Sequence, residues 1–240
     1  MENNYIYIPD KSQHEEFRCR VPLKDTEQVF VVDGKGEKMG LNLGKGEILP
    51  QMLQVIAVRS RQAQEDLSYS TDYILAERAQ ARVLLCSHTL SMEDFTTHEC
   101  VNVELGKGAI LDMVVMQNEH NKSKHSTSFK VQMEEGAVFN LNVVTLHGGE
   151  ISNEIEVNLN GKGGECNVNG LYLADGQQKV STRVNIFHNV PECHSSQLFK
   201  GILDGESRTS FSGKIYVAKD AQKTEAYQAN NNLLASRTAK

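Results

Sequence analysis

Hydrophobic residues alternate with polar residues in several separate stretches of the chain. From Val180 to Val190 the even positions are mostly apolar, and the odd positions are mostly polar. The same period of two occurs over residues 101–105, 155–159 and 209–217. Because successive side chains of a strand point to opposite faces, each stretch predicts a β-strand with one buried face.

Glycine-rich turns separate these stretches, at residues 34–36, 44–46, 106–108, 148–149, 161–164 and 176. The best candidate for an amphipathic helix, residues 61–66, is short and has no apolar stripe. After Pro50 the only proline is Pro191. Proline interrupts hydrogen-bonded sheets, so its scarcity favours an all-β fold with long sheets.

A repeat is visible in the turns. Gly108, Gly136 and Gly164 occupy similar segments and are equally spaced, by 28 residues. Asn-x-Asn segments recur at 140–142, 158–160 and 167–169, and stacked asparagines can form hydrogen bonds along an axis. We interpret the pattern as a parallel β-helix, a solenoid whose coils stack about 4.8 Å apart. An antiparallel sandwich shows the same alternation, but it gives no reason for equally spaced turns.

The domain prediction is a lead-in segment, residues 1–25, followed by one β-helix core domain, residues 26–240. The net charge of −6 argues against a nucleic-acid partner, which normally selects a basic face. No apolar stretch reaches 18 residues, and the amino terminus lacks the features of a signal peptide, so no membrane association is expected. Five widely spaced cysteines without a Cys-x-x-Cys motif predict free thiols in the cytoplasm.

His188 and Cys193 are weak candidates for metal ligands, because imidazole and thiolate bind borderline metals. Their spacing matches no standard zinc motif. His188 occupies an even position of its strand, as Val184 and Ile186 do, so it should point to the same, buried face. This position predicts a structural histidine that bonds to a backbone carbonyl. Cys193 has a histidine neighbour, His194, which could favour the thiolate.

Two further Cys/His pairs, Cys86 with His88 and His98 with Cys100, have the spacing that places both side chains on one face of a strand. Packing in the core is the favoured interpretation for both pairs. Residues 120–125 are expected to form a solvated polar loop. Motifs for a P-loop, a serine hydrolase or a zinc protease are absent, and no two carboxylates are placed face to face, so no catalytic residue is predicted.

The C-terminal third contains an ordered series of short motifs, at 170–173, 188–191, 193–197, 199–203, 211–217, 221–228 and 230–234. This series resembles the SufB/SufD family, and within it the SufD branch. The resemblance implies a right-handed parallel β-helix and a non-catalytic scaffold role in iron–sulfur cluster assembly. It also implies two partners, a SufB-like subunit and the ABC-type ATPase SufC. No cofactor is expected to be firmly bound, although iron or a cluster could be held transiently in the full complex.

Family members usually have a helical amino-terminal region, and they continue into a Cys-x-His-Gly strand and a helical tail that contacts SufC. This chain ends at Lys240 without these features, so no site residue is carried over from the family. We expect the chain to fold, to bind SufC poorly alone, and to form a homodimer through its last coil. The alternatives are a carbohydrate-active β-helix enzyme and a purely structural, protein-binding solenoid.

Overall fold

The computed structural model describes residues 23, 25–36, 38–91, 93–119 and 122–240. Those residues form strands and turns, with no helix. The strands are β1 (Thr26–Val32), β2 (Gly40–Leu43), β3 (Met52–Arg59), β4 (Leu67–Leu75), β5 (Gln80–Thr89), β6 (Thr96–Leu105), β7 (Ile110–Asn118), β8 (Lys124–Met133), β9 (Val138–His147), β10 (Glu150–Leu159), β11 (Glu165–Ala174), β12 (Lys179–His188), β13 (His194–Leu203), β14 (Arg208–Val217) and β15 (Glu225–Leu234).

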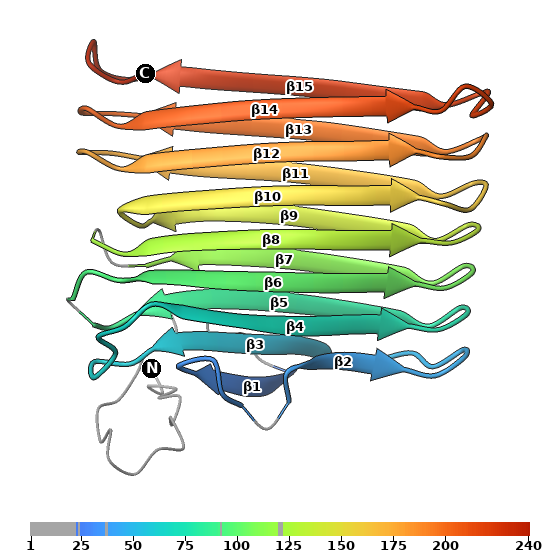
Figure 1. Ribbon diagram of the computed structural model, residues 1–240, viewed down its shortest axis with the longest axis horizontal. Helices are drawn as coiled ribbons and strands as arrows, with labels where there is room; N and C mark the ends of the chain where they lie inside the picture. Colours follow the sequence, from blue (N-terminus) through green and yellow to red (C-terminus); the bar gives the residue numbers. More distant parts are fainter. Residues whose placement is uncertain (1–22, 24, 37, 92, 120–121) are drawn as a thin grey trace.

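Successive strands alternate between two parallel sheets. The odd-numbered strands form an eight-stranded sheet and the even-numbered strands a seven-stranded sheet, each in chain order. In Figure 1 the even strands run to the right in front, the odd strands run to the left behind, and the chain climbs from β1 to β15, so the coil is right-handed. The predicted parallel β-helix is therefore confirmed. The sandwich alternative is wrong, because every neighbouring pair of strands is parallel.

The turn glycines follow the predicted repeat, except that the third glycine lies one residue earlier than predicted. Gly108 and Gly136 both adopt a φ of +65°, but the matching residue of the next coil is Gly163, at +69°, rather than Gly164. The difference arises because that coil is one residue shorter. Asn140 bonds to Asp112, 28 residues earlier, whereas Asn167 bonds to Asn140, 27 residues earlier.

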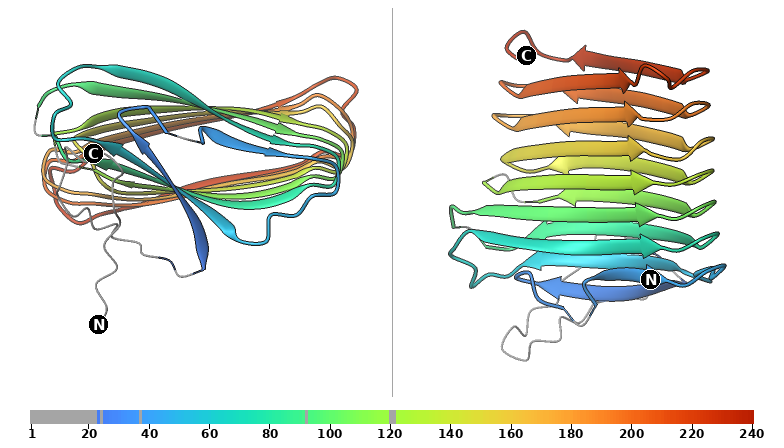
Figure 2. Two further views of the ribbon diagram at one scale, coloured as in Figure 1. Left: turned by 90° about the horizontal axis from the view of Figure 1, so that it is seen from below. Right: turned by 45° about the vertical axis from the view of Figure 1, so that its right-hand side comes forward.

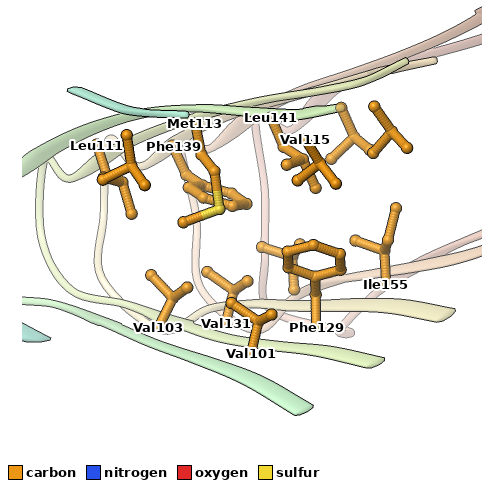
Figure 3. Close-up of a cluster of buried hydrophobic side chains, with 14 of the residues drawn as sticks. Val101, Val103, Leu111, Met113, Val115, Phe129, Val131, Phe139, Leu141 and Ile155 are labelled. Atoms are coloured by element: carbon orange, nitrogen blue, oxygen red, sulfur yellow. The ribbon is translucent and has the colours of Figure 1, made fainter. Parts of the chain in front are cut away.

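The core lies between the two sheets. Seen along the stack, the coil is flattened, and the sheets face each other across a narrow interior (Figure 2). Val101 and Phe129 from one sheet face Met113 and Leu141 from the other (Figure 3), and all four side chains are fully buried. Alternation in the sequence thus translates directly into two apolar surfaces, which stabilise the fold by about 25 cal/mol per Å² of apolar surface buried.

The outer surface carries the predicted asparagine stacks. Asn169 donates to Asn142 over 3.1 Å on one sheet, and Asn189 donates to Asn160 over 2.8 Å beside the other. These bonds run along the solenoid axis and join consecutive coils.

Most of the predicted lead-in, residues 1–25, lies outside the described residues, and β1 begins at Thr26. No helix long and apolar enough to cross a membrane occurs in the part of the chain that the structure describes.

Candidate functional site

His188 is fully buried at the end of β12, as its parity predicted. Its Nε2 lies 2.8 Å from the hydroxyl oxygen of Ser195 on β13, so the bonding partner is a side chain of the opposite sheet rather than the expected backbone carbonyl. Burial lowers the pKa of His188, and the nearby His194 lowers it further. The imidazole is therefore neutral, and its hydrogen bond with Ser195 connects the two sheets.

Cys193 is buried at the turn before β13. Its thiol donates to the carbonyl oxygen of Gly161 over 3.4 Å, and burial raises its pKa. A thiolate is therefore disfavoured at this position, contrary to the suggestion from its histidine neighbour. His194 instead lies at the surface, where its Nδ1 is 3.6 Å from Glu225.

The two other Cys/His pairs lie in different environments. Cys86 and His88 are buried, and Cys86 packs with Ile56 and Leu84 in a small cluster on the outward side of the eight-stranded sheet. For His98 and Cys100 core packing is wrong. They point outward because the neighbouring Val101 points inward, and His98 is exposed. None of the described cysteines forms a disulfide.

The expectation of a solvated loop is wrong for His125, which is the second residue of β8 and is buried. It has the same parity as Phe129 and Val131, so its side chain points into the core. Residues 120 and 121 of the expected loop lie outside the described residues.

His125 lies between two buried carboxylates. Its Nδ1 contacts the carboxylate of Glu119, and its Nε2 is 3.6 Å from Oε2 of Glu99. Thr89 donates a further hydrogen bond of 2.6 Å to Glu119. Glu99, Glu119 and His125 are only 2%, 5% and 4% exposed. Glu99 belongs to β6 and Glu119 follows β7, so this buried ionic network joins the two sheets.

The pKa values of the groups in and beside the ionic network are shifted from their ordinary values. Burial favours neutral His125, but the charge and hydrogen bond of Glu119 outweigh it and raise the pKa of His125 to about 10. Burial likewise opposes ionisation of Glu119, yet the contact with His125 leaves the pKa of Glu119 below its ordinary value. Burial, together with the charge of Glu99, raises the pKa of Tyr69. Near neutral pH the network therefore consists of an imidazolium and at least one carboxylate.

The surroundings of this network leave little room for a substrate. A cavity of about 10 Å³, lined by Tyr69, Thr97 and His125 among others, has space for about one water molecule. Within the described ranges no three His, Cys, Asp or Glu side chains are grouped to hold a metal ion. The geometry fits a structural ion pair. Sequence reasoning missed it, although extending the inward parity of Val101 back to Glu99 would have placed a carboxylate in the core.

In the described part of the chain, most residues of the last strand, β15, are exposed to solvent. The inward residues of β13, such as Gln197 and Phe199, are buried by the coil above them. The corresponding inward residues of β15, Gln228 and Asn230, are exposed, and Leu234 is 53% exposed. Among the described residues, β14 and β15 each have a paired strand on one side only, although the N–H of Thr209 on β14 donates to the carbonyl oxygen of Lys240. This end of the solenoid, which we call the open end, therefore presents unpaired backbone groups and core-type positions on one surface.

Comparison with known proteins agrees with this architecture. The family described as SUF system FeS cluster assembly, SufBD core domain, matches residues 58–240. The chain belongs to the SufBD core domain family. The match contains every strand from β4 to β15, so the SufBD core includes the ionic network, His188 and the open end.

Several SufBD relatives are known by sequence. The iron–sulfur cluster assembly protein SufD of Escherichia coli is 29% identical over 167 residues, which cover 69% of this chain and 39% of SufD. A SufBD family protein of Mycobacterium leprae is 29% identical over 117 residues, covering 46% of this chain and 30% of that protein. A SufBD family protein of Synechocystis is 24% identical over 166 residues, 69% of this chain and 37% of the relative. The chain thus spans well under half the length of these relatives.

Proposed function

We propose that this SufD-like chain is a non-catalytic scaffold subunit of iron–sulfur cluster assembly. Residues 26–240 act as one β-helix domain in the cytoplasm, in a complex with a SufB-like subunit and the SufC ATPase. Iron or an iron–sulfur cluster is cargo that the full complex holds transiently. The family membership and the open end support this role.

The open end is the observation that carries the proposal of a partner. The backbone N–H of Glu225 donates to the carbonyl oxygen of Cys193, just before β13, over 3.0 Å, and that of Ala235 donates to Leu203 of β13 over 2.7 Å. Because backbone groups alternate in direction along a strand, those of Gln228, Asn230 and Asn232 point toward the free edge. Such an edge accepts a strand from another chain. The SufB-like subunit pairs with this edge, and in its absence a second copy of the chain does so.

Proline substitution tests this edge. Gln228→Pro removes an N–H that points to the free edge but leaves the bonds between β13 and β15. The matched control, Gln228→Ala, keeps the N–H. Light scattering of the unmodified chain and the control should give the mass of a dimer, and Gln228→Pro should give the mass of a monomer with an unchanged far-UV circular dichroism spectrum. Likewise, the unmodified chain and Gln228→Ala should co-purify with a SufB-like subunit, and Gln228→Pro should not.

A monomeric unmodified chain that also fails to bind a SufB-like subunit would exclude this edge as the contact. The alternative of a carbohydrate-active enzyme predicts cleavage of polysaccharides by the purified chain, and our proposal predicts none. A purely structural solenoid would bind protein but would have no effect on cluster assembly by the complex.

A further inference from the structure

The two sheets have different outward faces. On the seven-stranded sheet the outward residues near the C-terminal end are mainly polar, for example Ser181, Arg183 and Ser212, beside the aromatic pair of Phe187 and Tyr216. On the eight-stranded sheet, five aliphatic side chains at the same end are between 38% and 62% exposed: Leu171, Leu173, Leu198, Ile202 and Leu233. We call these five residues the aliphatic patch.

Strand register makes the patch continuous. Leu173 on β11 is level with Ile202 on β13, which is level with Leu233 on β15. Leu198 and Ile202 lie on the same face of β13, four residues apart. Three strands at about 4.8 Å spacing give a width close to the diameter of an α-helix, about 10 Å. Exposed aliphatic groups arranged contiguously mark an interaction site rather than an ordinary surface.

An unpaired cation lies at the centre of the patch. Lys200 is flanked on its own strand by Leu198 and Ile202, and it is level with Leu171 and Asn231 on the neighbouring strands. No acidic residue occupies these four adjoining outward positions. Among the described residues, Lys200 has no ion pair. Other lysines of the surface do pair, as Lys179 does with Glu150.

We propose that the aliphatic patch and Lys200 bind an amphipathic α-helix of a partner protein, one that carries an Asp or Glu within its apolar stripe. Parallel sheets are commonly covered by helices, and the contiguous aliphatic surface that such a cover needs is present on this face. The acidic residue is required because an apolar cover would otherwise bury Lys200 without a counter-charge. This site is separate from the free edge of β15 and does not depend on the proposed edge pairing.

A charge swap tests the proposal on the intact chain. The probe is a fluorescein-labelled helical peptide of sixteen residues, designed with leucines at helical spacing and one glutamate in that stripe, and its binding is measured by fluorescence anisotropy. Lys200→Glu should weaken binding of this peptide by about fivefold. A peptide with lysine in place of the glutamate should instead bind Lys200→Glu more tightly than the unmodified chain. Leu198→Ser should weaken both peptides by about tenfold. Lys214→Glu, an exposed lysine of the other sheet, is the matched control and should have no effect.

Four results would overturn the proposal. One is absence of binding, and another is equal binding by the Lys200→Glu and Lys214→Glu variants. A third is a dimer, detected by light scattering, that Leu198→Ser dissociates, since a second copy would then be the occupant. The last is patch-dependent sedimentation with vesicles of anionic phospholipid, which would assign the face to a membrane. The Gln228→Pro variant should bind the peptide normally, so failure of the edge contact and failure of this site are distinguishable.

Discussion

Replacing Glu119 with glutamine should strongly destabilise the protein. Glu119 and His125 are both buried and in direct contact, and Glu119 also accepts a hydrogen bond from Thr89. Removing one member of a buried ion pair leaves the other charge uncompensated, which typically costs about 3–5 kcal/mol. Domains are stable by only about 5–15 kcal/mol, so this loss is a large fraction of the total. Urea denaturation at pH 6, followed by far-UV circular dichroism, measures it.

The pH dependence provides a second readout. The pKa of His125 is raised to about 10 in the folded protein, above its ordinary value of about 6.5. The imidazolium therefore stabilises the fold fully below about pH 6.5, and the contribution is lost as pH rises toward 10. In the unmodified protein the free energy of unfolding should fall over this range, by at most about 1.4 kcal/mol per pH unit from this group. Glu119→Gln should flatten that slope.

The matched control is Glu154→Gln, which breaks an exposed pair between Glu154 and Arg183 at 3.4 Å. The effect of the control should stay below about 1 kcal/mol. A loss for Glu119→Gln no larger than that of the control, together with an unchanged pH slope, would refute our reasoning about the ionic network.

Three further predictions concern single side chains. His188→Ala should lower the melting temperature, because the Ser195 hydroxyl loses its partner at a cost of about 1–3 kcal/mol; an unchanged melting temperature with loss of bound iron would instead favour a ligand role. In urea denaturation, Gly161→Ala should destabilise the protein far more than Gly163→Ala, because a Cβ at Gly161 would lie 1.9 Å from the backbone nitrogen of Glu135. A Cβ at Gly163 meets no atom within 4 Å, so that variant should lose only the backbone cost of a positive φ, about 1 kcal/mol. At pH 8 iodoacetamide should modify Cys100 before Cys166, because burial raises the pKa of Cys166 to about 12. Equal labelling of the two cysteines in the folded protein, read by mass spectrometry, would contradict the burial of Cys166.

Local periodicity was sufficient to predict the class of fold. Alternation identifies which side chains of a strand point inward without knowledge of its neighbours, so the burial of Val184, Ile186 and His188 was predictable from the sequence. The spaced glycines indicated coils, and the C-terminal motifs indicated the family. These properties depend on residues close together in the chain.

Register between coils was not predictable to the same accuracy. The turn at Gly164 was assigned one residue too late, because equal spacing conceals a coil that is one residue shorter. An error of one residue in the length of a coil shifts every later pairing between strands by one position, and so it changes the predicted neighbours.

The contacts that matter most for function depend on that register. Parity places Glu99 and His125 in the core, but only the stacking of β6 on β8 and the turn after β7 bring Glu119 to the same imidazole. The surroundings of Lys200 are likewise supplied by β11 and β15, each about one coil away in sequence. The sequence determined the face on which each side chain lies, because that is a local property of a strand. The tertiary structure alone decided which side chains meet, because that requires the lengths of all intervening turns.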